Sequence, residues 1–187
     1  MERARNFKDR LETLLTESRL LLETNSLCTK SIFVAGNNTN HFFHELLVGL
    51  EGVLCLHQVG EQEVGEMVDC EALVHRLTED SSLLSLSITV GSPLPEVFIN
   101  GIRLRETLRW LFRGALRNGH KTADISHQDN ALIISCHSEN SPSSSLEDLL
   151  EYHIANEIFS FSEQALLWED NGQSAKFTLS FLSDSSR

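Results

Sequence analysis

The hydrophobic residues of this chain follow a helical spacing at first and a mixture of helical and alternating spacings later. Over residues 3–28, apolar side chains recur every three or four positions with charged residues between them, which predicts an amphipathic helix. Residues 36–40 (GNNTN) have the composition of a turn, and they can cap a second helix over about residues 40–58. Two such helices joined by a short loop form a helical hairpin.

The second helix carries an apolar stripe, which consists of Phe43, Leu46, Leu47, Leu50, Val53, Leu54 and His57. A hairpin cannot cover its own stripe. It either pairs with a second copy about a two-fold axis, which forms a four-helix bundle, or packs against the rest of its own chain. We expect the homodimer, and packing within the chain is the alternative.

A polar link over residues 59–66 is followed by mixed patterns. They predict a short helix (67–79), a strand (83–90), a helix (101–119), strands at 121–126 and 131–137, a loop (138–145), a helix (146–159), and a hairpin of 164–170 with 175–182 turning at Asn171-Gly172. The fold class is therefore α+β, with a mainly antiparallel sheet and helices on one face. We expect two domains, residues 1–62 and 63–187.

Composition and charge narrow the classes of partner and compartment. The net charge of -12 argues against nucleic acid as a partner, because phosphate contacts need a basic surface. The four cysteines are scattered without a CxxC pair, which favours reduced, structural thiols and a cytosolic compartment. The charged first 15 residues are unlike a signal peptide, and no apolar run approaches a membrane span. We expect a cytoplasmic protein with no membrane partner.

Three stretches resemble the catalytic core of sensor histidine kinases. The segment 68-VDCEALV-74 is similar to the entry of the family's ATPase domain, and 172-GQSAKFTLSF-181 is similar to its closing strand. The most specific match is 103-RLRETLRWLFRGALRNG-119, which resembles the family helix often written RLRQVLLNLLSNAIKHG. The resemblance implies a dimerisation hairpin followed by an ATPase-type α/β sandwich of the GHKL class.

The departures from that family concern its nucleotide site. The family's magnesium-binding asparagine falls on Trp110 or Gly114, and its Asp-x-Gly-x-Gly loop falls on 138–145, which has no aspartate or glycine. Glu139 is the only carboxylate there that could read an adenine, and a glycine-rich lid is missing. Magnesium needs oxygen ligands, and phosphates need cations or close backbone approach. The resemblance thus implies a degenerate domain without ATP or another cofactor, similar in plan to bacterial histidine phosphotransferases of the ChpT type.

The run 44-HEL-46 matches the core of the family's phosphoacceptor motif. An exposed imidazole is a nucleophile at neutral pH, and Glu45 could accept its proton or orient its ring. At about 100° per residue, His44 lies roughly 120° from the centre of the stripe and faces outward with Glu51. The family's histidine, however, lies on the first hairpin helix. A solvated histidine without chemistry is therefore the alternative.

The other histidines carry less signal. His41 and His44 are three residues apart, but no third or fourth ligand has a recognisable spacing, so we expect no metal site. His57 lies on the apolar stripe and is expected in a core or interface. The leading hypothesis is a histidine phosphotransferase in which His44, assisted by Glu45, relays phosphoryl groups between response-regulator receivers. The rival is an inactive, kinase-like adaptor, and an active ATP-dependent kinase is disfavoured by the missing groups.

Overall fold

The computed structural model describes residues 32–60, 65–91, 93–138, 149–160, 164–170 and 174–181. The chain divides into two compact units, residues 1–55 and 56–187. The predicted first hairpin helix, residues 3–28, lies outside the described residues. The hairpin and the domain boundary between residues 62 and 63 therefore stay predictions.

Helix α2 (Ile32–Gly60) is longer than the sequence predicts. The turn expected at residues 36–40 is wrong, because these residues are helical. Glycine and asparagine cost a helix less than about 1 kcal/mol each relative to alanine, which a helix of 29 residues tolerates. Local turn composition is outweighed here by the length of the helix.

The larger sheet has five strands: β2 (Ser87–Val90), β4 (Thr122–Gln128), β5 (Ala131–His137), β7 (Ser174–Ser180) and β6 (Ala165–Asp170), in that spatial order. The pair β2–β4 is parallel and the other three pairs are antiparallel. The predicted mainly antiparallel sheet is confirmed, although the strand expected over 83–90 is confined to its last four residues.

The strand register brings small and large apolar side chains into separate rows on the inner face. Cys136 stands opposite Ala123 on one side and Ala175 on the other. Ile134 likewise pairs with Ile125 and with Phe177. All six side chains are fully buried, and the residues between them along each strand are more exposed. This alternation of period two is the signature of a sheet with one covered face.

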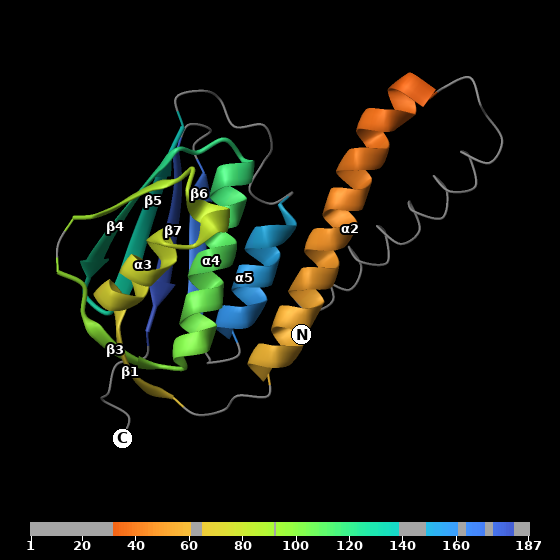
Figure 1. Cartoon of the computed structure of the whole chain (residues 1–187). Coiled ribbons are helices and arrows are strands. Elements are labelled where there is room, and N and C mark those ends of the chain that lie inside the picture. The colour runs from red at the N-terminus through yellow and green to blue at the C-terminus, as the bar shows by residue number, and fades with distance from the viewer. Residues whose placement is uncertain are drawn as a thin grey trace. The chain divides into compact units, whose positions relative to one another are not determined.

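Three helices cover that face (Figure 1): α3 (Cys70–Thr78), α4 (Gly101–Arg117) and α5 (Leu150–Ser160). Helix α4 lies between the other two and contacts both. Asn100 caps it by accepting a hydrogen bond from the backbone N–H of Arg103 at 3.0 Å. Leu104, Leu108 and Leu111 are its fully buried stripe. The α+β fold with helices on one face is confirmed.

A second, two-stranded sheet pairs β1 (Glu66–Asp69) with β3 (Glu96–Ile99) in antiparallel register. The sequence missed β3, which lies just after the two prolines, and wrongly extended the helix of residues 67–79 over β1. Asp69 ends β1 and caps α3, since its carboxylate accepts from the N–H of Ala72 at 3.0 Å. A single turn of 3-10 helix, η1 (Ser81–Leu83), follows α3 and is capped by Asp80.

The last turn of α2 belongs to the second unit and touches the start of α4. Arg103 is buried, and its Nη2 donates to the backbone carbonyl of Val59 at 3.5 Å. Carbonyls of a helix's last turn have no partner within the helix, so an arginine can satisfy one of them. None of the described helices has the length and apolarity that a membrane crossing requires.

Candidate functional site

Adjacent positions of α2 hold an exposed histidine and a buried carboxylate. His44 is exposed, whereas only 7% of the surface of Glu45 is accessible. Consecutive helical residues point about 100° apart, which accounts for the difference. The imidazole is therefore open to an incoming group. Its reactivity, and the assisting role of Glu45, stay predictions.

Helix α2 has a leucine-rich exposed face and a small-residue buried face. Leu47, Leu50 and Leu54 are 58%, 54% and 62% exposed, and Val53 is 42% exposed. The buried face is formed by Glu45, Val48, Gly49 and Gly52, together with Val59. Much of the apolar stripe predicted from the sequence therefore remains in contact with solvent in the single chain. Exposed apolar side chains gathered in this way mark an interaction surface.

Helices α4 and α5 meet at Gly114. A β-carbon at this position would lie 2.8 Å from Cε1 and 3.0 Å from Cζ of Tyr152, and 3.2 Å from Cβ of Glu151. Real β-carbons do not approach carbon atoms at 2.8 Å, so only glycine allows the two helices to pack this closely. Tyr152 is itself fully buried and stacks against Phe177 of β7, with ring centroids 4.9 Å apart.

An ion pair also joins α4 to α5, one helical turn after Gly114. Nη1 of Arg117 donates to both carboxylate oxygens of Glu151 at 3.0 Å. The side chain of Glu151 is 3% exposed and that of Arg117 is 20% exposed. This pair is held in a low-dielectric setting, where charge-assisted hydrogen bonds are strong.

Trp110, one turn before Gly114, is also inward: it is 3% exposed, and the guanidinium of Arg113 lies 4.4 Å from its ring centroid. This is a cation–π contact, and neither group offers a metal ligand. Position 110 thus has an indole side chain and position 114 has no side chain, so neither supplies an oxygen ligand for a metal ion.

Comparisons with known proteins bear on the fold. No protein-family model matches the chain, and no curated protein matches it. Among solved structures, histidine kinase AdeS from Acinetobacter baumannii is 18% identical with a TM-score of 0.59, covering 94% of this chain and 98% of that chain. The cytoplasmic segment of histidine kinase QseC is 12% identical with a TM-score of 0.53, covering 73% and 95%. The fold of the chain is similar to that of these histidine kinases.

A third structure, full-length ShkA in complex with AMPPNP, is 18% identical with a TM-score of 0.53, covering 94% of this chain and 46% of that chain. At these identities the likeness shows the fold alone. The sequence resemblance puts the family's magnesium-binding asparagine at position 110 or 114 of α4. In the structure Trp110 is buried against Arg113, and Gly114 packs against Tyr152.

Several predicted residues cannot be placed. Glu139 and the rest of residues 139–148 lie outside the described residues, as do the side chains of His41 and His57. Within the described ranges, no three histidine, cysteine, aspartate or glutamate side chains gather to hold a metal ion.

Sequence reasoning missed the contribution of α5 to this region. Nothing in the spacing of residues 149–160 indicates that Tyr152 and Glu151 pack against α4. The one available signal was Gly114 itself, because a glycine inside a helix costs about 1 kcal/mol and often marks a close approach of another segment.

Proposed function

We propose that this chain is a histidine phosphotransferase of two-component signalling, acting in the cytoplasm without using ATP. His44 takes a phosphoryl group from a phosphorylated receiver aspartate and passes it to the aspartate of a second receiver. The observation that supports this most directly is an imidazole exposed on a long helix that precedes a histidine-kinase-like core.

The reaction balances as a transfer between two acceptors. A ring nitrogen of neutral His44 attacks the phosphorus of the acyl phosphate. The nitrogen–phosphorus bond forms as the bond to the aspartate oxygen breaks, and the carboxylate leaves. The proton of the imidazole is released to a base, a role that Glu45 is proposed to fill. Magnesium held by the receiver would neutralise the phosphoryl oxygens.

The contact between α4 and α5 supports independence from ATP. Tyr152 fills the space in front of Gly114, and Cβ of Glu151 lies 3.2 Å from the place of a β-carbon there. A fully packed tyrosine leaves no room at this place for a hydrated magnesium ion.

The exposed leucines of α2 support a homodimer built on the helical hairpin. Burying a leucine side chain that is otherwise exposed contributes about 1.5–3 kcal/mol. Leu47, Leu50 and Leu54 lie three and four residues apart, the spacing with which helices pair in a four-helix bundle.

A non-catalytic adaptor is the second candidate, and one observation favours it. His44 lies on the helix that leads directly, through residues 61–65, into β1. The family resemblance places the reactive histidine on the helix before that one. An adaptor would use the same exposed surfaces to bind its partner and would need no phosphoryl acceptor.

Transfer from phosphorylated receivers tests the proposal. Receiver domains carrying ³²P-labelled aspartyl phosphate are mixed with the wild-type chain and with His44→Ala. The proposal expects acid-labile, alkali-stable label on the wild type and none on the variant. Because His44 is exposed, the variant should keep its circular dichroism spectrum and melting temperature.

The outcomes separate the candidates. A wild-type chain that binds receivers but takes no label is the adaptor. Label that survives His44→Ala would place the acceptor on another histidine, for which His75→Ala and His127→Ala are matched variants. Micromolar affinity for ATP, measured by calorimetry, would contradict the loss of the nucleotide site.

A further inference from the structure

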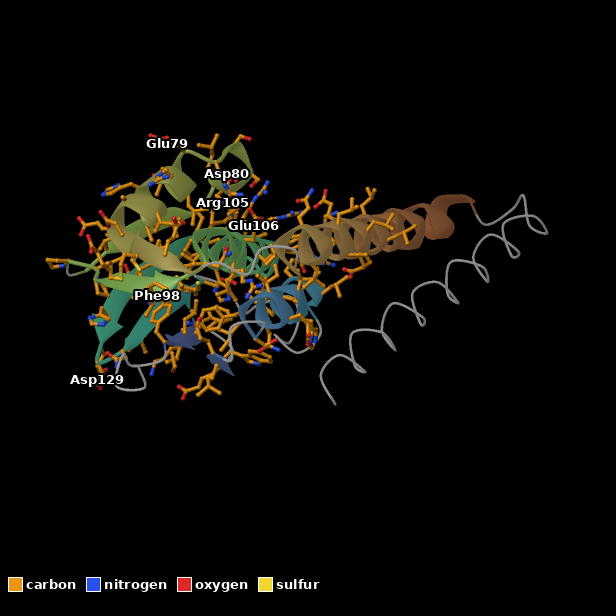
Figure 2. All side chains as sticks on the ribbon, turned by 90° about the horizontal axis from the view of Figure 1, so that it is seen from below. Glu79, Asp80, Phe98, Arg105, Glu106 and Asp129 are labelled. Atoms are coloured by element: carbon orange, nitrogen blue, oxygen red, sulfur yellow. The ribbon has the colours of Figure 1, made fainter. Side chains whose placement is uncertain are left out.

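A groove opens on the side of α4 away from α5. It has a volume of about 390 Å³ and lies between α3, the turn into η1, and the first half of α4. Its floor is formed by Leu73 and Leu77, one wall by Arg76 and Asp80, and the other by Arg105, Glu106 and Arg109. Figure 2 shows Asp80, Arg105 and Glu106 gathered where α3 ends and α4 begins. We call it the α3–α4 groove.

Ion pairs hold the walls of the groove in place. Nε and Nη2 of Arg105 donate to Oε1 of Glu106 at 3.0 and 2.8 Å. Arg109 extends this pairing across the groove: its Nε lies 3.1 Å from Oδ2 of Asp80 and its Nη1 lies 3.6 Å from Oε2 of Glu106. Asp80 is fixed in turn by the N–H and hydroxyl of Ser82, at 2.9 and 2.7 Å.

Two arginines of the groove still have donors to offer. A guanidinium has five N–H donors, and Arg105 uses two of them on Glu106 while its side chain remains 52% exposed. Arg76, in the last turn of α3, is exposed and forms no ion pair with any residue in the ranges the structure describes. Two accessible guanidinium groups thus flank an apolar floor.

The charge of this surface contrasts with that of the chain. Two of the five arginines of helix α4, Arg105 and Arg109, line the groove, in a protein whose net charge is -12. In the groove, three arginines face two carboxylates, which leaves one net positive charge. A cationic patch on an acidic protein steers and orients an acidic partner.

We propose that the α3–α4 groove is a docking site for an acidic, leucine-bearing segment of a partner protein. A carboxylate of that segment binds Arg76 and Arg105, and an aliphatic side chain enters the groove above Leu73 and Leu77. The proposal does not depend on His44 or on phosphoryl transfer, because the groove is built entirely from α3, η1 and α4.

The mixed charge of the walls favours a peptide over a small anion. Phosphate and sulfate are anions, so the carboxylates of Asp80 and Glu106 repel them. A peptide supplies carboxylates to the arginines and backbone N–H donors to these two acids. An open groove with an aliphatic floor also suits side-chain anchoring, the mode in which extended or helical segments are recognised.

Binding of a defined peptide tests the proposal. The probe is a fluorescein-labelled octapeptide of alternating glutamate and leucine, with the glutamine–leucine octapeptide as its uncharged counterpart. Fluorescence anisotropy on the full chain should show binding of the acidic probe and at least tenfold weaker binding of the counterpart. Side-chain Nε–H signals of Arg105 and Arg109 should shift during the titration.

Charge-matched variants locate the site. Arg76→Glu with Arg105→Glu should weaken the acidic probe at least tenfold. Lys121→Glu with Lys176→Glu, two exposed cations outside the groove, alters the net charge equally and should change affinity less than twofold. Arg105→Glu places a carboxylate beside Glu106, so it removes an ion pair of the wall as well as a positive charge. Arg76 forms no ion pair within the described ranges, and Arg76→Glu alone is therefore the second variant. Its affinity for the acidic probe should fall at least threefold.

Four results would overturn the proposal. The first is binding of the acidic probe without a shift of the arginine signals, and the second is no binding at millimolar concentration. The third is an equal loss of affinity in both double variants. The fourth is a shift of the same signals and displacement of the probe by inorganic phosphate at sub-millimolar concentration, which would make the groove a small-anion site. The phosphotransfer experiment with His44→Ala has an independent readout, so the two proposals can fail separately.

Discussion

Tyr152 of α5 occupies the space that faces Gly114 of α4, at a distance of 2.8 Å from the place where a β-carbon would lie. The two helices are in contact because one of them lacks a side chain at this point. Gly114, one of the two positions where the sequence resemblance expects a metal-binding asparagine, is therefore part of the buried contact between the two helices.

This contact predicts that Gly114→Ala destabilises the protein, although alanine is the better helix former. The gain in helix propensity is about 1 kcal/mol, whereas overpacking costs typically 1–3 kcal/mol. In a Tyr152→Ala background the ring is gone, and the same substitution should become neutral or stabilising. Urea denaturation of the four proteins in this cycle measures the coupling, and additive effects would contradict the close approach.

The ion pair of Arg117 with Glu151 predicts an asymmetric response to substitution. Glu151→Gln leaves a largely buried guanidinium without its carboxylate and should lower the free energy of unfolding by about 3 kcal/mol. Replacing both residues by methionine should recover much of that loss. The exposed pair of Lys176 with Glu169, 3.9 Å apart, is the control, and breaking it should cost under about 1 kcal/mol. Equal losses at the two pairs would show that burial of the first is unimportant.

The exposed face of α2 predicts a dimer that charge can dissociate. Leu50→Glu with Leu54→Glu should reduce the molar mass in light scattering from twice 21.0 kDa to 21.0 kDa. Leu84→Glu with Leu167→Glu places the same charges on two leucines outside α2 that are 72% and 57% exposed, and should leave the mass unchanged. A wild-type chain of 21.0 kDa at micromolar concentration would refute the dimer.

Burial predicts a loss of stability in alkali. Desolvation, with a smaller contribution from Asp124, raises the pKa of the Cys136 thiol from 9.0 to about 12. The unfolded chain therefore ionises this thiol first. The contribution of this thiol to the free energy of unfolding is fully present below pH 9 and falls by about 1.4 kcal/mol per pH unit as the pH rises toward 12.

Cys136→Ala should remove this dependence, so the gap between variant and wild type should narrow between pH 8 and pH 10.5 in denaturation experiments. Ile134→Val is the control, because it removes packing from the same strand without removing an ionisable group. A gap of constant size for Cys136→Ala would indicate that the thiol is solvated.

The sequence predicts the sheet and its covering helices well, because their patterns are strong and local. Leu104, Leu108 and Leu111 recur at helical spacing and are all fully buried on α4. In β5, Leu132 and Ile134 alternate with more exposed residues, and both are buried as the pattern requires. One face of each element is buried, so the spacing of its apolar residues matches its structure and the prediction is confirmed.

The weaker predictions failed where the local pattern was short or contradicted by tertiary contacts. Strand β3 has four residues directly after Pro95, too few for an alternation to stand out. The helix expected from residue 67 begins at Cys70, because the preceding residues pair with β3. A pairing partner some 30 residues away leaves no trace in the local spacing.

In the candidate site, too, the sequence predicted the local feature and missed the contacts between distant residues. Helical periodicity placed His44 outward, and it is exposed. The packing of Tyr152 on Gly114 and the pairing of Arg117 with Glu151 join residues more than 30 positions apart, and the spacing of neither helix reports them. Only the three-dimensional arrangement shows that Tyr152 fills the space in front of Gly114.

The contact at Gly114 also limits which substitutions the chain can accept at this position. An asparagine at this position would collide with the tyrosine ring, so the single substitution Gly114→Asn destabilises the fold. Tyr152 would have to be replaced by a smaller residue beforehand, at the expense of its stacking on Phe177. The two substitutions are therefore epistatic, because the fold accepts the asparagine only after the tyrosine has been replaced.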